Sequence, residues 1–275
     1  MDVFLYEGGA IRWFLPQIRL RGFALKIMKL QDFFEAHPSI ALGFSGGVDS
    51  SYLLYEAIKN QVDVGVFYVK TQFQPAFEYE DARRVGRELG VKIHVISLDI
   101  LEAPRVVENP SDRCYYCKQV LFGAICQEAG KMGYTQVMDG TNASDDVSDR
   151  PGIKALQEFQ VYSPLRLCGL TKAEIRKRSR EVGLFTWDKP SYACLATRIR
   201  TGMPITNDQL NRVEQAEEYL KSLGFTDFRV RIREEGALLQ IRKPQFDLYE
   251  SKKAQIQAGL RRWFGKVVEE PEERG

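Results

Sequence analysis

A glycine-rich turn between an apolar run and a helical pattern constrains this chain more than any other feature. Residues 39–44 form a short apolar run, and residues 52–58 carry the apolar spacing of a helix. The turn that joins them consists of Ser45, Gly46, Gly47, Val48, Asp49, Ser50 and Ser51. Glycine lets the backbone approach an anion closely, and the N–H groups at a helix N-terminus attract negative charge. The sequence therefore predicts a phosphate-binding turn between a strand and a helix.

Strands and helices are expected to alternate along most of the chain. The expected strands are 40–44, 62–69, 92–96 and 136–138, and the expected helices are 26–37, 52–59, 77–89, 114–132 and 171–182. This alternation predicts an α/β fold with a doubly wound parallel sheet. Ligands of such sheets bind beyond the carboxyl ends of the strands. We therefore expect the phosphate turn, Lys70-Thr71 and Gly140-Thr141-Asn142 to meet in one crevice, with Gly140 contributing to ATP binding.

The sequence divides into three expected parts. Residues 1–25 are interpreted as an N-terminal extension that we expect to be poorly ordered. Residues 26–200 are expected to form the domain with the phosphate turn. Composition changes near Thr201, and residues 201–275 are interpreted as a smaller α/β domain for substrate binding or oligomerisation. Its expected elements are helices at 208–223, 245–250 and 255–263 and strands at 228–233 and 237–241.

A polar loop at 142–152 follows the last expected strand of the first domain. It carries Asp145, Asp146, Asp149 and Arg150. One interpretation is a solvated loop, because connecting segments are usually polar and exposed. The other is a lid that supplies contacts to Mg²⁺ or to the adenine base.

Composition excludes several classes of protein. No run of about 18 or more apolar residues occurs, so we expect no membrane span. Asp2, Glu7, Arg12 and Pro16 interrupt the pattern of a signal peptide, so we expect a cytoplasmic protein. The formal charge of +2 is too small to indicate a nucleic-acid partner. Five cysteines are an odd number for a disulfide framework, which favours metal or redox chemistry for those that cluster.

Two of the cysteines open a predicted helix. Cys114 and Cys117 are spaced to lie on one helical face, and position at a helix N-terminus lowers the pKa of a thiol. Such a pair is half of a metal or cluster site, a redox dithiol, or two buried thiols. Cys126 and Cys168 are interpreted as core thiols.

The phosphate turn lacks the Gly-Lys-Ser/Thr of a Walker loop and resembles the pyrophosphate loop (PP-loop) of the ATP pyrophosphatase superfamily. Residues 109–118, residues 187–191 and Cys194 together resemble the LarE family of that superfamily. The resemblance implies an enzyme that splits ATP between its α and β phosphates. It implies adenylation of a carboxylate of pyridinium-3,5-biscarboxylic acid mononucleotide and replacement of oxygen by sulfur, in synthesis of the nickel-pincer nucleotide, the lactate racemase cofactor. Mg²⁺ would act with Asp49.

The same resemblance implies a role for three cysteines. Family members with three resemble enzymes in which the thiolates hold a four-iron, four-sulfur cluster, and Cys114, Cys117 and Cys194 match that set. Three thiolates leave one iron of the cluster without a protein ligand, which favours delivery of an exogenous sulfide. The alternative, seen in members with one cysteine, is that Cys194 gives up its own sulfur.

Basic residues of the second domain are candidates for substrate binding. Arg198 follows Cys194 closely, and the alternation of a strand places Arg229 and Arg231 on one face. The resemblance implies that the Arg-x-Arg pair binds the substrate phosphate, and a solvated basic strand is the alternative. The region 239–243 has no carboxylate, which argues against the second-domain metal site of the single-cysteine members.

Three other functions stay open at this point. A tRNA thiolase shares the PP-loop but should present a strongly basic face. An ammonia-fed synthetase forming amides would need no cysteine trio. A nucleotide sensor would bind ATP without releasing pyrophosphate. The resemblance favours an enzyme with a small-molecule nucleotide substrate over these three functions. It also implies a homo-oligomer.

Overall fold

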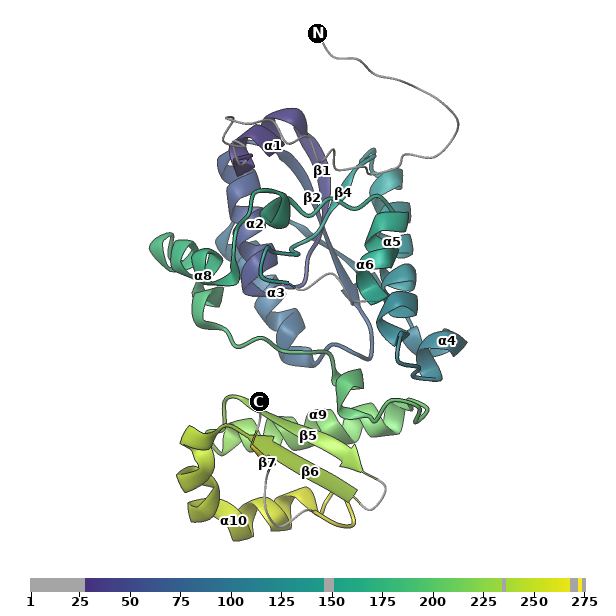
Figure 1. The fold of residues 1–275 in the computed structure, drawn as a ribbon, viewed down its shortest axis with the longest axis vertical. Helices are drawn as coiled ribbons and strands as arrows, with labels where there is room; N and C mark the ends of the chain where they lie inside the picture. Colours follow the sequence, from purple (N-terminus) through teal and green to yellow (C-terminus); the bar gives the residue numbers. More distant parts are fainter. Residues whose placement is uncertain (1–27, 146–150, 234–235, 268–271, 274–275) are drawn as a thin grey trace, which may run out of the picture.

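A computed structural model describes residues 28–145, 151–233, 236–267 and 272–273 (Figure 1). The expected extension at 1–25, and Asp146, Asp149 and Arg150 of the polar loop, lie outside these residues. Four parallel strands form the first sheet in the order β3-β2-β1-β4. They are β1 (Ser39–Gly43), β2 (Asp63–Lys70), β3 (Ile93–Ser97) and β4 (Val137–Met138). The expected parallel α/β sheet is confirmed.

Helices cover both faces of this sheet, because alternate side chains of each strand point to opposite sides. Ile40 and Leu42 of β1 pack with Tyr68 of β2 in one core, whereas Ala41 and Phe67 belong to another. The first core is covered by α1 (Leu30–Ala36), α2 (Val48–Lys59), α3 (Ala76–Glu88), α7 (Pro164–Leu167) and α8 (Lys172–Glu181). The second is covered by α5 (Arg113–Lys131) and α6 (Pro151–Glu158).

The strand order fixes where a ligand can bind. The chain runs from β1 outward to β3 and then returns to place β4 on the other side of β1. The loops that follow β1 and β4 therefore leave the sheet side by side, at the point where the strand order reverses. Such a switch point opens a crevice at the carboxyl end of a parallel sheet.

A smaller sheet lies in the lower part of the molecule in Figure 1. The strands β5 (Phe228–Arg233) and β6 (Gly236–Ile241) pair antiparallel, and β7 (Glu272–Glu273) pairs parallel with β6. The helix α9 (Asn207–Ser222) packs on β5 and contacts α10 (Phe246–Leu260). Two helices were expected in place of α10, and the structure forms one, because neither glycine nor proline interrupts residues 246–258.

A third core joins the smaller sheet to loops and short helices that follow β2 and β3 of the first sheet. It contains residues of α9, β5, β6 and α10 together with Leu195 and Ile199 of the preceding segment. Phe73 after β2, Ile100 of η1 (Ile100–Glu102) and Val106 of α4 (Pro104–Val107) pack into the same core. Residues 189–200, the Cys194 segment, are therefore tied to the second sheet as well as to the first part of the molecule.

Candidate active site

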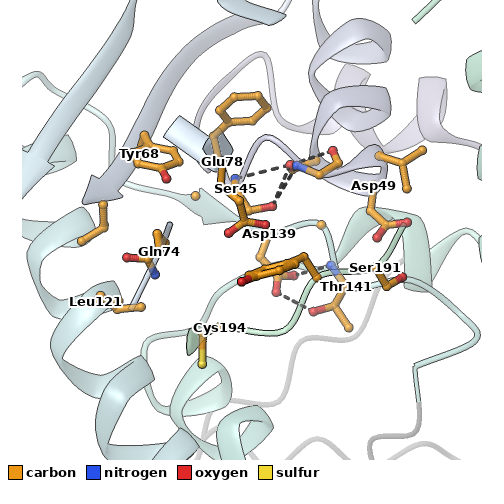
Figure 2. A pocket seen from close by; sticks show the side chains of 18 of the residues that line it. Ser45, Asp49, Tyr68, Gln74, Glu78, Leu121, Asp139, Thr141, Ser191 and Cys194 are labelled. Carbon is orange, nitrogen blue, oxygen red and sulfur yellow. Dashed lines mark hydrogen bonds between the residues drawn. The ribbon is translucent and has the colours of Figure 1, made fainter. Parts of the chain in front are cut away.

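A cavity of about 460 Å³ opens at the carboxyl ends of the first sheet (Figure 2). Its walls come from the phosphate turn, the end of β2, the start of α3, the middle of α5, the loop after β4 and the segment 189–194. The predicted site residues that line it are Ser45, Gly47, Val48, Asp49, Ser50, Gly140 and Cys194. Gly46 and Ser51 belong to the turn but do not line the cavity. Of the other crevice residues expected, Thr141 lines the cavity and Lys70, Thr71 and Asn142 do not.

The phosphate turn is shaped by backbone conformation and by hydroxyl groups. Gly46 has a φ of 71°, and a Cβ there would lie 3.0 Å from Ala82 of α3, so a side chain would be strained and crowded. Ser50 Oγ accepts from the Ser45 N–H at 3.3 Å and lies 3.1 Å from Ser45 Oγ. Gly47 is the N-cap of α2 and has no side chain to accept from the first helical turn. Those N–H donors remain available to an anion.

Gly140 brings the end of β4 against the start of α2. A Cβ at this position would lie 3.0 Å from Ser50 N and 3.2 Å from Ser50 Cα. Only glycine fits there without displacing the backbone. The neighbouring Asp139 is buried, and it accepts hydrogen bonds from Ser163 Oγ at 2.7 Å and Thr141 N at 3.2 Å. The loop after β4 therefore packs closely against the start of α2 beside the turn.

Two lysines that sequence analysis missed flank the turn. Lys172, the first residue of α8, forms an ion pair with Asp49. Lys189 pairs with Asp81 of α3 at 2.7 Å and donates to the Gly46 carbonyl at 3.4 Å. Both lysines line the cavity. The helix start after Thr171 and the motif at 187–191 mark these positions in the sequence, but nothing local indicates that they face the turn.

Asp49 presents a carboxylate oxygen that the fold leaves without a partner. Burial raises the pKa of the Asp49 carboxyl, although the Lys172 ammonium opposes the rise. Its Oδ1 is buried and has no hydrogen-bond partner among the residues that the structure describes. Asp145 also lines the cavity, and its charge acts on Asp49. Mg²⁺ is commonly held by one or two carboxylates and the phosphates of a nucleotide, so Asp49 and Asp145 fit that ion.

The three candidate cysteines come together from two segments. Cys114 and Cys117 lie near the start of α5, and Cys194 immediately precedes η3 (Leu195–Arg198). The charges of Cys114 and Cys194 both act on Cys117, so the three thiols lie within electrostatic range of one another. Cys194 lines the cavity, and Figure 2 shows it across the pocket from Asp49. Cys114 is exposed and Cys117 is partly buried.

Arg113 and Asn109 hold the Cys194 segment against α5. The buried Arg113 guanidinium donates to Asn109 Oδ1 and, at 3.2 Å, to the Ala196 carbonyl. The Asn109 side chain donates in turn to the carbonyls of Arg200 at 2.8 Å and Met203 at 3.0 Å. Two buried polar side chains therefore fix the third thiol relative to the first two.

The expected lowering of the pair's thiol pKa values is wrong for Cys117. Burial raises the pKa of Cys117 to about 12, and the neighbouring Cys194 and Cys114 add to the rise. Burial also raises the pKa of Cys194. Desolvation of a thiolate outweighs the helix N-terminus and the nearby cations Arg113 and Lys118.

The thiols match an iron–sulfur cluster in donor type, and their role as its ligands stays a prediction. Among the residues described, no group of three or more His, Cys, Asp or Glu side chains could hold a single metal ion. In a four-iron cluster each thiolate binds a different iron, so the thiols need not meet at one point. Of the remaining cysteines, Cys168 is buried in the first core and Cys126 packs at the edge of the second.

Arg198 is not placed to bind a substrate directly, which corrects the sequence interpretation. Its side chain is fully buried and pairs with Glu217 of α9, with Nε 2.8 Å and Nη2 3.0 Å from the carboxylate. Its Nη1 donates to the carbonyls of Ala193 at 2.7 Å and Cys194 at 3.3 Å. Arg198 therefore positions the cysteine segment. The sequence places Arg198 close to Cys194, but it gives no sign that Arg198 pairs with the buried carboxylate of Glu217.

Arg229 and Arg231 lie beside this segment. Arg229 is buried and donates to the carbonyl of Ser191 at 3.0 Å, and burial lowers the pKa of its guanidinium to about 10. Arg231 is partly buried and donates to Gln240 Oε1 at 2.5 Å and to the Thr197 carbonyl at 2.7 Å. Both side chains are at least partly buried, although β5 lies at the edge of its sheet, and neither lines the cavity. Their proposed role with the substrate phosphate stays a prediction.

Comparisons with known proteins show similarity over most of the chain. It is 35% identical over 221 residues to the uncharacterized protein slr1717 of Synechocystis, covering 80% of this chain and 81% of that protein. It is 29% identical over 204 residues to the pyridinium-3,5-bisthiocarboxylic acid mononucleotide synthase of Lactiplantibacillus plantarum, covering 74% of each. A tRNA-specific 2-thiouridylase of Thermotoga maritima is 26% identical over 53% of this chain and 52% of its own. No protein-family model matches the chain.

Within the described residues, every helix is too short or too polar to cross a membrane.

Proposed function

The chain belongs to the PP-loop ATP pyrophosphatase superfamily, and from this premise we propose that it is an ATP-dependent sulfur transferase of the LarE type. In this proposal it adenylates a carboxylate of pyridinium-3,5-biscarboxylic acid mononucleotide and replaces a carboxylate oxygen with sulfur, in synthesis of the nickel-pincer nucleotide. The relative from Lactiplantibacillus plantarum, whose name specifies the bisthiocarboxylic product, supports this acceptor. A cytoplasmic homo-oligomer acting on this small-molecule nucleotide completes the proposal.

One observation carries the proposal. Cys194 lines the same cavity as Ser45, Asp49 and Gly140. Adenylation requires the acceptor carboxylate to reach the α phosphate of ATP, and sulfur transfer then requires a nucleophile at the same carbon. The phosphate turn would serve the first step, and sulfur held at Cys194 in the wall of the same cavity would serve the second, without movement of the activated intermediate.

The residues around the turn have the chemistry that adenylation needs. The N–H groups at the start of α2, with Lys172 and Lys189, would bind the departing pyrophosphate. Mg²⁺ held by Asp49 and Asp145 would neutralise further charge. Adenylation turns a poor leaving group into AMP, so positioning and charge neutralisation are the main contributions of the protein.

The cysteines provide the sulfur end of the site. We propose that Cys114, Cys117 and Cys194 hold a four-iron, four-sulfur cluster, which when bound would carry a sulfide on its open iron. Anaerobic reconstitution with iron and sulfide should then give the broad visible absorption of a cluster. A colourless protein that loses one sulfur atom from Cys194 per turnover would support the sacrificial alternative instead.

The arginine pair is proposed to recognise the phosphate of the acceptor. Guanidinium groups suit phosphate, and Arg229 and Arg231 lie beside the Cys194 segment through their bonds to Ser191 and Thr197. Replacement of both by glutamine should raise the acceptor concentration needed for half-maximal rate and leave ATP cleavage capacity intact. Unchanged acceptor dependence would remove this assignment.

A second candidate is thiolation of tRNA, which the similarity to the 2-thiouridylase favours. Anaerobic incubation of the protein with ATP, sulfide and either the mononucleotide or bulk tRNA separates the two. Mass spectrometry should find one sulfur in place of one oxygen on the mononucleotide, with AMP formed in equal amount. Thiolated tRNA with an unmodified mononucleotide would favour the second candidate, and amide formation from added ammonia would contradict both.

A further inference from the structure

The loop between β2 and α3 holds a glutamine whose amide orientation is fixed. Gln74 Oε1 lies 3.0 Å from Thr71 N and 2.7 Å from Thr71 Oγ1. A backbone N–H can only donate, so the side-chain atom that it reaches must be the amide oxygen. This assignment removes the usual ambiguity between the two ends of a glutamine amide. The Nε2 group, with two N–H donors, is therefore the other end.

Gln74 lies in the wall that also carries Cys194. Both residues line the cavity, and the Leu195 N–H donates to the Phe73 carbonyl at 2.9 Å, which joins their two segments. In Figure 2, Gln74 and Cys194 lie on the same side of the pocket, and the amide nitrogen of Gln74 is on the side toward Cys194. The phosphate-binding groups around Asp49 are on the opposite side. A carbon held between AMP and a sulfur nucleophile at Cys194 would therefore pass close to this amide.

We propose that Gln74 is a catalytic residue whose Nε2 donates a hydrogen bond to the carbonyl oxygen of the acyl adenylate while sulfur attacks. The inference rests on the proposed function and names a residue for its second step. Hydrosulfide forms a C–S bond to the carbonyl carbon, and the electron pair of the C=O bond moves onto oxygen. The oxyanion collapses, the bond from carbon to the AMP oxygen breaks, and AMP leaves with that electron pair. With hydrosulfide, one proton is released and the acid is left as a thiocarboxylate.

Negative charge grows on the carbonyl oxygen only in this step, so a fixed N–H donor stabilises the transition state more than the ground state. Thr71 fixes the amide before substrate binds, and the donor needs no reorganisation during the reaction. A donor of this kind contributes to the sulfur-transfer step and little to ATP binding. That separation distinguishes it from a contact to the nucleotide.

The test compares Gln74→Glu and Gln74→Met with wild type in two assays. Glutamate keeps an oxygen for the Thr71 donors and loses the N–H donor, and methionine removes both polar ends. The rate of sulfur transfer to the mononucleotide should fall about 100- to 1,000-fold in Gln74→Glu. The acceptor-dependent exchange of pyrophosphate into ATP should change by less than about threefold, because adenylation does not use this donor. Thr71→Val, which removes one of two anchors, should have an intermediate effect.

Gln72→Met is the matched control, because Gln72 is in the same loop, bonds to Asp99 and Ile100, and does not line the cavity. It should transfer sulfur at the wild-type rate. Wild-type transfer rates in both Gln74 variants, or equal losses in exchange and transfer with a raised KM for ATP, would overturn the role of Gln74 alone. Absence of transfer by the wild-type protein would overturn the proposed function together with it.

Discussion

The two ends of the cavity are built in different ways. The centre of the phosphate end is one contiguous stretch, in which β1 leads through the turn into α2, and backbone N–H groups there are joined by Lys172 and Lys189 from later in the chain. The sulfur end joins α5 to a segment far along the chain, and buried side chains such as Arg113 and Arg198 hold the parts together. Substitutions that crowd the backbone should therefore disturb the phosphate end, whereas loss of a single buried polar side chain should disturb the sulfur end.

The largest effect is expected from a substitution that removes the chemistry of the sulfur end and leaves the phosphate end intact. Cys194→Ser should lower sulfur transfer by at least about a thousandfold, because the variant loses the thiol that would hold the cluster or, in the sacrificial alternative, supply the sulfur itself. Exchange of pyrophosphate into ATP should persist, since the phosphate end is untouched. Cys126→Ser is the control and should keep transfer near the wild-type rate. Undiminished sulfur transfer by Cys194→Ser would contradict the assignment of sulfur delivery to the Cys194 end of the cavity.

Removal of the buried arginine should destabilise the sulfur end. Arg198→Met leaves the Glu217 carboxylate, which is 2% exposed, without its cation. The free energy of unfolding should fall by about 3–5 kcal/mol, as measured by urea denaturation. The double variant Arg198→Met, Glu217→Gln should lose less than the sum of the two single changes, because they remove one interaction. A loss below about 1 kcal/mol in Arg198→Met would be typical of a surface pair and would contradict this account.

The lysine beside Asp49 tests the phosphate end. Lys172→Met should slow acceptor-dependent AMP formation about 10- to 100-fold, the size expected for one hydrogen bond to a charged group. Lys177→Met is the matched control, because Lys177 is exposed on the same helix, and it should behave as wild type. If both variants form AMP at equal rates, Lys172 does not serve the phosphates.

Two glycine substitutions compare crowding at the phosphate end with open space. Gly140→Ala should cost about 1–3 kcal/mol of stability, because the methyl group meets the backbone of Ser50. Gly130→Ala, in α5, meets no atom within 4 Å and should be neutral or stabilise the helix by up to about 1 kcal/mol. Thermal denaturation of both proteins measures the difference. Equal melting temperatures would show that β4 can move away from α2.

The smallest effect concerns Lys221 of α9, beside the Cys194 segment. Burial lowers the pKa of Lys221 to about 8, and its ammonium lies over the Phe77 ring. Burial disfavours the charged form of Lys221, and the resulting loss of folding stability is fully present below about pH 8. This loss disappears as the pH rises past the ordinary pKa of lysine in the unfolded chain. Lys221→Met should therefore gain more stability over wild type at pH 7 than at pH 10, and a pH-independent difference would contradict the shift.

Sequence reasoning was most successful where the site is contiguous. The strand, turn and helix around Gly46 and Gly47 were predicted because all the determinants lie in one short stretch. Lys172 and Lys189 were missed because only the tertiary fold brings them to the turn. Arg198 was misassigned because its partner, Glu217, lies on α9, a later helix that packs on β5. The direction of the Cys117 pKa was wrong because burial, which no local pattern displays, outweighs the helix N-terminus.

The central claim is that one cavity activates a carboxylate and then delivers sulfur to it. The most direct measurement uses the mononucleotide with heavy oxygen in its carboxylates, incubated with the wild-type protein, ATP and sulfide. The account predicts one heavy oxygen in AMP for each sulfur atom found in the product, because sulfur displaces the oxygen that bridges to the α phosphate. Sulfur gained without labelled AMP, or labelled AMP formed without sulfur in the product, would contradict it.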